Sequence, residues 1–297
     1  RHTFDCDNCP EVQKTIQANQ DPEVFYPDIQ GRDVKEMPYT DVYVAGFPCQ
    51  PFSAMEKQES FNDTLGRGMI FFYILEYIIC HTPKVFILEN VRGLARINNG
   101  KDLRRILQLL MQVTFNGKSA YVIKHQIMDT KEQGIPHSRP RWYCVGIRKD
   151  ASESDSFTFP GIIECPVIEE FLDDDVNSLD FRNKSQQVNN TMSANINKAK
   201  QHIKESGGDL EQPYVVDCDA SRQKSCHMKN VSPCLTRSRN KGHWLIHKNR
   251  RMNIKEMMRL QGIDPKSFKQ VVPDSVMGQQ LGNCLLYTSP SPRDVSL

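Results

Sequence analysis

A cysteine between two prolines is the residue of this 297-residue chain best placed to do chemistry. Residues 46–53 read Gly-Phe-Pro-Cys-Gln-Pro-Phe-Ser and follow a short apolar run at residues 42–45 that predicts a buried strand. Ligands of open α/β sheets bind at the carboxyl ends of such strands. Most cysteines are simply small buried side chains, and Cys49 alone would suggest no more. However, Pro48 and Pro51 fix the backbone on both sides of the thiol, which favours a functional cysteine.

Charged residues of both signs lie near other predicted strands. Glu89 follows the continuous apolar run at residues 85–88, which is typical of a strand buried on both faces. Arg139 and Arg141 end the segment Gln-Gly-Ile-Pro-His-Ser-Arg-Pro-Arg at residues 133–141.

The elements that would position these residues alternate between strands and helices. Apolar patterns predict strands at residues 2–7, 42–45, 85–88, 121–127 and 142–147, and helices at residues 10–19, 69–80 and 101–112. This alternation favours an α/β fold. Beyond residue 150 the chain is rich in Ser, Asn, Asp and Lys with weak periodicity, which indicates a second, smaller lobe. A last helix is predicted at residues 250–261.

Composition narrows the class of protein without identifying it. Hydrophobic residues make up 38% of the chain and charged residues 25%, as in a globular protein, and no apolar run approaches the length of a membrane span. The net charge of +2 requires any nucleic-acid surface to come from local clustering of Lys and Arg. Such clustering occurs at residues 222–251, although a solvated charged face is the competing interpretation.

The ten cysteines indicate a reducing, intracellular location, because no signal peptide precedes them and their spacing is irregular. That location would be the nucleus in a eukaryote and the cytoplasm in a prokaryote. Cys6 and Cys9 have the spacing of metal ligands, but no second pair of matching spacing follows, so we expect no metal site.

The octapeptide at residues 46–53 resembles the nucleophile motif of the DNA (cytosine-5)-methyltransferases. Companion motifs follow in the family's order: Glu-Asn-Val at 89–91, the Gly-Ile-Pro and two-arginine segment at 133–141, Lys-Glu-Met-Met-Arg-Leu-Gln-Gly at 255–262, and Gln-Leu-Gly-Asn at 280–283. The resemblance spans about residues 4 to 284, with a weakly matching insert. It implies an S-adenosylmethionine-dependent, Rossmann-like mixed sheet flanked by helices, with a smaller target-recognition lobe.

The resemblance also implies a reaction. Cytosine carbon 5 is a poor nucleophile until a thiolate attacks carbon 6, and Cys49 is the expected nucleophile. Glu89, protonated in a dry pocket, would donate a hydrogen bond to ring nitrogen 3. Arg141 would contact ring oxygen 2, with Arg139 nearby; an ion pair between strands is the alternative for Arg141. A stacked base cannot reach such a pocket, so base flipping is implied.

Further residues receive binding roles from the same resemblance. Asp7 is expected to bind the ribose hydroxyls of S-adenosylmethionine and Asp28 its adenine amino group, although a helix-start acid and a turn former are the alternatives. Pro48 and Asn283 complete the expected cofactor site. The expected partner is double-stranded DNA, bound without membrane or second subunit and with any regulatory domains outside this stretch. The residues expected to contact it are Gln50, Ser53, Arg67, Asn90, Arg237 and Arg239.

The expected domains are a methyltransferase domain at residues 1–155, a target-recognition lobe at 156–245, a return to the first domain at 246–285 and an atypical tail at 286–297. The family's first strand and glycine-rich loop would precede residue 1, so we expect an N-terminally truncated domain. The family continues after Asn283 with a helix, and the prolines at residues 290 and 292 cannot sit inside a helix, which suggests a non-native tail.

Two other functions remain open. A related branch of the family methylates cytosine in tRNA, but its second lobe carries a Cys-Phe-Thr tripeptide that this chain lacks. A catalytically silent DNA-binding relative would usually lack the cysteine or the acid, and both Cys49 and Glu89 are present.

Overall fold

The computed structural model describes residues 1–48, 70–151, 157–173 and 189–283. Backbone contacts divide the chain into two compact units, residues 1–128 with 140–160 and residues 129–139 with 161–297. No helix in the described ranges combines the length and the apolar character needed to cross a membrane. The eight cysteines of these ranges are all free thiols.

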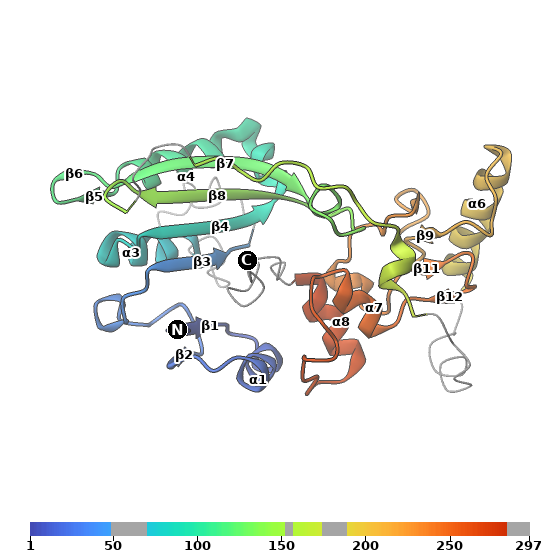
Figure 1. The fold of residues 1–297 in the computed structure, drawn as a ribbon, viewed down its shortest axis with the longest axis horizontal. Coiled ribbons are helices and arrows are strands. Elements are labelled where there is room, and N and C mark those ends of the chain that lie inside the picture. The colour runs from blue at the N-terminus through green and yellow to red at the C-terminus, as the bar shows by residue number, and fades with distance from the viewer. Residues whose placement is uncertain (49–69, 152–156, 174–188, 284–297) are drawn as a thin grey trace. The chain divides into compact units, whose positions relative to one another are not determined.

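A four-stranded mixed sheet forms the centre of the first unit (Figure 1). Its order is β3 (Val42–Gly46), β4 (Val85–Val91), β8 (Pro140–Arg148) and β7 (Tyr121–Asp129). Strand β3 runs parallel to β4, and β8 runs antiparallel to β4. The predicted α/β fold with a mixed sheet is therefore confirmed.

Helices α3 (Ile70–His81) and α4 (Lys101–Met111) pack on this sheet through one apolar core. The core is formed because α3 is apolar almost throughout and α4 carries an apolar stripe that buries Ile106 and Leu110. From the sheet, Phe86 and Leu88 of β4 enter the same core and are fully buried. Both helices lie within a residue of their predicted bounds.

A second, two-stranded parallel sheet lies at the start of the chain. It pairs β1 (Phe4–Cys6) with β2 (Val24–Tyr26), and α1 (Pro10–Asn19) connects them. Pro10 opens α1, where a missing N–H costs nothing. The remaining short elements of the unit are η1 (Val34–Glu36), η3 (Arg92–Ala95), η4 (Ile97–Gly100) and the hairpin of β5 (Thr114–Phe115) and β6 (Lys118–Ser119).

The second unit has a four-stranded sheet of its own, ordered β10 (His227–Lys229), β9 (Tyr214–Val216), β11 (Trp244–Leu245) and β12 (Arg250–Arg251). Helix α6 (Asn190–Glu205) buries Met192, Ile196, Ala199 and Ile203 against it. These residues recur at helical spacing, so the weak periodicity inferred for this stretch concealed a regular amphipathic helix. The short helices are η5 (Thr130–Glu132), η6 (Ile168–Phe171) and η7 (Arg237–Arg239).

The helix predicted at residues 250–261 is shorter than expected. Residues 250 and 251 form β12, and α7 (Ile254–Arg259) begins after Asn253. A capping box explains the boundary: the Asn253 side chain accepts from the Glu256 backbone N–H, and the Glu256 side chain accepts from that of Asn253. Helix α8 (Asp274–Asn283) follows in the same unit. The predicted return of residues 246–285 to the methyltransferase domain stays a prediction.

Candidate active site

The ends of β3 and β4 bring together two of the predicted motifs. In the parallel register Gly46 is paired with Glu89, so the backbone that leads to residue 49 leaves the sheet beside the acid. Cys49 itself lies outside the described residues, as do Gln50, Ser53 and Arg67. Their roles stay predictions.

Asn90 connects the two strand ends. Its Nδ2 donates to the carbonyl of Phe47 at 2.9 Å, and its Oδ1 accepts from the backbone N–H of Val91 at 2.8 Å. With 1% exposure, the Asn90 side chain is buried and supports the backbone before Pro48, which is exposed. Asn90 thus stabilises the backbone at Phe47, directly after β3. Its expected contact with DNA stays a prediction.

Glu89 forms an ion pair with Arg141, whose Nε lies 3.0 Å from Oε1. Arg141 is the cross-strand partner of Val91, two residues after Glu89, so both side chains lie on one face as diagonal neighbours. They are 14% and 12% exposed, which leaves each an edge accessible to a ligand. The arginine stabilises negative charge on Glu89, which opposes the protonated state expected from burial alone.

Arg139 occupies a different environment, in the second unit. Its Nη1 donates to the carbonyls of Leu235 at 2.9 Å and Gly282 at 3.2 Å, and its side chain is buried. Its backbone N–H donates to Asp129 Oδ1 at 2.7 Å. The two arginines of the motif, separated by Pro140, are therefore held by different partners, and the catalytic role of Arg139 stays a prediction.

Asp7 and Asp28 follow the carboxyl ends of the parallel strands β1 and β2, where Cys6 is paired with Tyr26. The Asp7 carboxylate accepts from the Cys9 backbone N–H at 2.8 Å, and the Asp28 carboxylate accepts from that of Gln30 at 2.9 Å. Burial raises the pKa of Asp7, and the Cys9 bond opposes that shift.

A side chain that the motifs did not indicate joins the two loops. Gln13 of α1 donates through Nε2 to the carbonyls of Asp7 at 2.8 Å and Pro27 at 3.3 Å. Cys6 ends β1, and the pKa of its thiol is raised to about 11, chiefly by burial; Arg32 opposes the shift, and the carboxylates of Asp28, Asp7 and Asp5 add to it. Cys6 is thus held as a thiol.

S-adenosylmethionine can be tested against these residues. Each carboxylate accepts one backbone N–H and retains lone pairs for further donors. Ribose hydroxyls and an adenine amine are such donors, and in the described ranges the ion pairs include none to Asp7 or Asp28. The residues present therefore fit the group.

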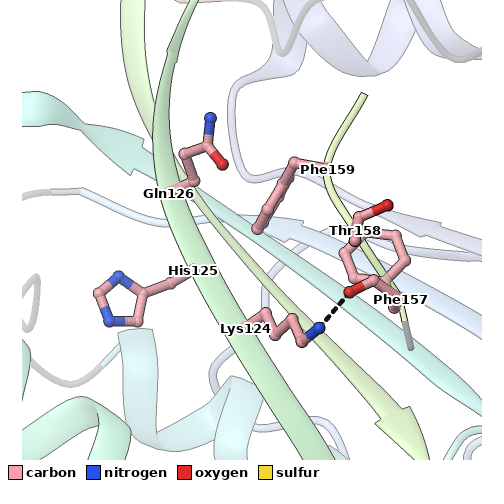
Figure 2. A pocket seen from close by; sticks show the side chains of 6 residues that line it. All are labelled: Lys124, His125, Gln126, Phe157, Thr158 and Phe159. Carbon is pink, nitrogen blue, oxygen red and sulfur yellow. Dashed lines mark hydrogen bonds between the residues drawn. The ribbon is translucent and has the colours of Figure 1, made fainter. Parts of the chain in front are cut away.

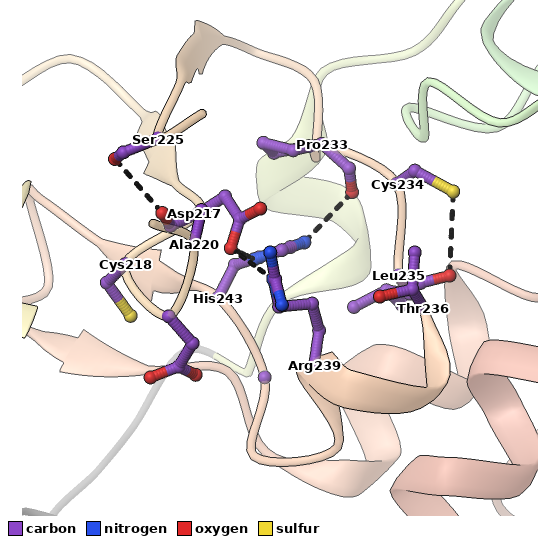
Figure 3. Close-up of polar contacts among 12 residues, drawn as sticks. Asp217, Cys218, Ala220, Ser225, Pro233, Cys234, Leu235, Thr236, Arg239 and His243 are labelled. Atoms are coloured by element: carbon purple, nitrogen blue, oxygen red, sulfur yellow. Dashed lines mark hydrogen bonds and ion pairs between the residues drawn. The ribbon is translucent and has the colours of Figure 1, made fainter. Parts of the chain in front are cut away.

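The two arginines of the second unit that are predicted to contact DNA differ in exposure and in their bonding partners. Arg237, on η7, is exposed. Arg239 donates through Nε to Asp217 at 2.5 Å, and His243 lies on the same carboxylate with Nδ1 at 3.8 Å (Figure 3). Burial lowers the pKa of His243 although Asp217 opposes the shift. Of the two predicted DNA contacts, Arg237 is open to a ligand and Arg239 supports the fold.

No three His, Cys, Asp or Glu side chains of the described ranges are grouped to hold a metal ion.

A shallow cleft of about 500 Å³ lies on β7 and the segment after β8 (Figure 2). Lys124 donates there to the carbonyl of Phe157. None of its lining residues belongs to the predicted motifs.

The model of the C-5 cytosine-specific DNA methylase family matches residues 1–288. The chain belongs to this family.

Relatives of this methylase agree with that assignment. It is 30% identical over 278 residues to the Type II methyltransferase M.NgoBI of Neisseria gonorrhoeae, covering 87% of this chain and 74% of that protein. It is 29% identical over 273 residues to the Type II methyltransferase M.DsaV of Dactylococcopsis salina, covering 91% and 72%. The predicted family and enzyme class are confirmed.

Solved structures show the same fold. A putative DNA modification methyltransferase encoded within an E. coli prophage superposes with a TM-score of 0.62 at 17% identity, covering 95% of this methylase and 87% of that chain. The S. pombe Dnmt2 methyltransferase superposes with a TM-score of 0.57 at 17% identity, covering 95% and 86%.

Sequence reasoning missed Gln13 and the support role of Asn90 in this methylase. A glutamine in the first turns of a helix between two acid-bearing strand ends is a weak signal. The motif position of Asn90 was visible, but its bond to Phe47 depends on the pairing of β3 with β4.

Proposed function

We propose that this methylase transfers a methyl group from S-adenosylmethionine to carbon 5 of a cytosine flipped out of duplex DNA. The observation that carries the proposal is the pairing of Gly46, three residues before Cys49, with Glu89, which in turn contacts Arg141. The acid and the cation thus lie on neighbouring strands of one sheet, and the chain segment that leads to Cys49 leaves the adjacent strand beside them.

In the proposed reaction the Cys49 thiolate adds to carbon 6 of cytosine and drives electron density toward carbon 5. Bound S-adenosylmethionine supplies the electrophilic methyl group. Loss of the proton from carbon 5, taken up by water, then expels the thiolate and restores the ring.

Glu89 and Arg141 would stabilise the charge that this attack places on the ring. A guanidinium has five N–H donors. Arg141 holds Glu89 through Nε and donates through Nη1 to the carbonyl of Pro140 at 3.0 Å, and another N–H of the same group would donate to ring oxygen 2. Glu89 must carry a proton to donate to ring nitrogen 3. Because Arg141 favours the anion, that proton is acquired as the base displaces water from the pair.

Asp7 and Asp28 would bind the ribose hydroxyls and the adenine amine, with Pro48 and Asn283 completing the site. Arg237 would contact a backbone phosphate and help to hold the duplex while the base is flipped, a step that costs a few kcal/mol. Duplex DNA, rather than tRNA, is favoured by the absence of a Cys-Phe-Thr tripeptide from the chain.

A trapping experiment tests the proposal. Duplexes of random sequence with 5-fluorocytosine replacing cytosine are incubated with the protein and S-adenosylmethionine, and denaturant-resistant adducts are resolved on a gel. Fluorine cannot leave carbon 5 as a proton does, so the covalent adduct persists. We expect an adduct with wild type, none with Cys49→Ser, and at least tenfold slower formation with Glu89→Gln.

The substrate is settled by a parallel arm with 5-fluorocytosine tRNA. An adduct with tRNA alone would replace DNA as the substrate. No adduct with either nucleic acid, or one that persists in Cys49→Ser, would refute the enzymatic proposal.

A further inference from the structure

Helix α8 and the turn at η7 approach each other backbone to backbone. A Cβ placed on Gly278 would lie 2.0 Å from the carbonyl oxygen of Asn240, and one on Gly282 would lie 2.2 Å from the backbone nitrogen of Arg237. Glycines four residues apart share one face of a helix. Because both obstructing atoms are backbone atoms, the turn can lie this close only to glycine.

Arg139 fastens the same two segments. Its Nη1 donates to the carbonyl of Leu235, which enters the turn, and to the carbonyl of Gly282, which ends α8. A third bond crosses the contact, from Asn240 Nδ2 to the carbonyl of Ser275 at 3.2 Å. One buried guanidinium thus bridges chain segments far apart in the sequence.

Each segment carries a residue with a proposed ligand. The turn presents the exposed Arg237, and α8 ends at the exposed Asn283, directly after Gly282. If the turn and α8 shifted relative to each other, the proposed DNA contact at Arg237 would move relative to the proposed cofactor contact at Asn283.

We propose that Arg139 is a positioning residue that locks the DNA-contacting turn to the cofactor end of α8. This inference rests on the proposed function. The guanidinium is suited to the task because its N–H donors lie in a rigid plane, whereas apolar packing would allow the turn to slide. Arg139 then acts on both ligands without touching either.

The test measures two affinities in folded protein. Binding of a 5-fluorocytosine duplex is followed by fluorescence anisotropy, and binding of S-adenosylhomocysteine, the demethylated cofactor, by calorimetry. We expect Arg139→Leu to weaken both by at least about tenfold, because hydrogen bonds from a charged donor are lost at both segments. Arg139→Lys, which keeps a charged donor, should restore part of both affinities.

A matched control removes another arginine of the same unit. Arg259 donates to the carbonyl of Phe171 at 3.0 Å and to Asp173 at 2.6 Å. Arg259→Leu should lower the melting temperature and leave both affinities near wild type. If Arg139→Leu does not fold, Gly282→Ala serves instead: its methyl group displaces the turn while Arg139 is retained, and both affinities should fall.

Hydrogen exchange separates this inference from the proposed function. Amides of residues 236–240 and 280–283 should exchange faster together in Arg139→Leu without any ligand present. Wild-type affinities in the folded variant, loss of only one affinity, or unchanged exchange in either segment would overturn the positioning role. If wild type binds neither probe, the proposed function fails as well, whereas coupled exchange would still show the lock.

Discussion

Glu89 is held between two chemical demands. Arg141 stabilises its anion, and the proposed contact with ring nitrogen 3 requires its acid. In the proposed complex an entering base would displace the remaining water from both side chains, which are only slightly exposed. Proton uptake on substrate binding is the expected consequence of this arrangement.

Asp7 illustrates a residue whose proposed role opposes stability. Burial raises its pKa above the ordinary value of 3.8, so the ionised form is disfavoured in the folded state at neutral pH. Asp7→Asn removes that penalty, since its amide oxygen still accepts from Cys9. We expect an unchanged or higher melting temperature together with at least about tenfold weaker binding of S-adenosylhomocysteine, measured by calorimetry.

Asp5→Asn is the control for this prediction. Asp5 lies in β1, two residues before Asp7, and burial also raises its pKa, against the effect of His2. It precedes the strand end, so its replacement should leave cofactor binding unchanged. Wild-type affinity in Asp7→Asn would contradict the assignment of the ribose contact.

Arg237 and Arg239 form a natural matched pair. Arg237→Ala should weaken binding to DNA and reduce the slope of log affinity against log salt by about one, with no change in melting temperature. Arg239→Ala leaves the largely buried Asp217 without its guanidinium, and should destabilise the second unit by about 1–3 kcal/mol. Anisotropy titrations over a range of salt and thermal melts measure the two effects. A reversal of the two phenotypes would refute this division of roles.

At the scale of elements, the central sheet depends on one close approach. Gly146 of β8 is paired with Phe86 of β4, and a Cβ on Gly146 would lie 2.1 Å from the Phe86 ring. The ring packs edge-on against Tyr121 at 4.9 Å and cannot yield easily. Strands β4 and β8, which carry Glu89 and Arg141, can therefore pair at this position only because residue 146 has no side chain.

Gly146→Ala should destabilise the first unit by about 1–3 kcal/mol through overpacking, as measured by the midpoint of urea unfolding. Phe86→Leu in the same chain should relieve part of this loss, because the smaller side chain leaves room for the methyl group. Additive effects of the two substitutions would show that the contact is not responsible.

At the scale of the molecule, the second unit carries a distinct sensitivity to acid. Burial lowers the pKa of His227, His243 and His247 below 6.5; His202 adds to the shift at His227, and Glu169 opposes it at His247. Below the unfolded pKa, the unfolded state takes up protons that the folded state does not. The free energy of unfolding should therefore fall as the pH drops below about 6.5.

This prediction is checked by hydrogen exchange at pH 7 and pH 5.5. Amides of residues 189–283 should lose protection more than those of residues 70–128. The double variant His227→Gln/His247→Gln should reduce the pH dependence of stability by up to about two protons. Equal loss in both units of wild type would refute it.

The family, the α/β class and the order of the main elements could all be predicted from the amino-acid sequence. Periodicity and strand-end residues are local properties, so α1, α3, α4 and β4 could be predicted within a few residues. The prediction of helices failed at two places. Polar residues obscured the apolar face of α6, and the cap formed by Asn253 places the start of α7 later than predicted.

Which residues contact one another could not be predicted without the three-dimensional fold. The Glu89–Arg141 pair depends on the antiparallel register of β4 and β8, and the two bonds of Gln13 depend on the parallel pairing of β1 and β2. Arg139, two residues from Arg141 in the motif, bonds instead to carbonyls about 100 and 140 residues further along the chain. A motif constrains residue type and spacing, whereas hydrogen bonds between distant segments exist only once the register and packing of the fold are set.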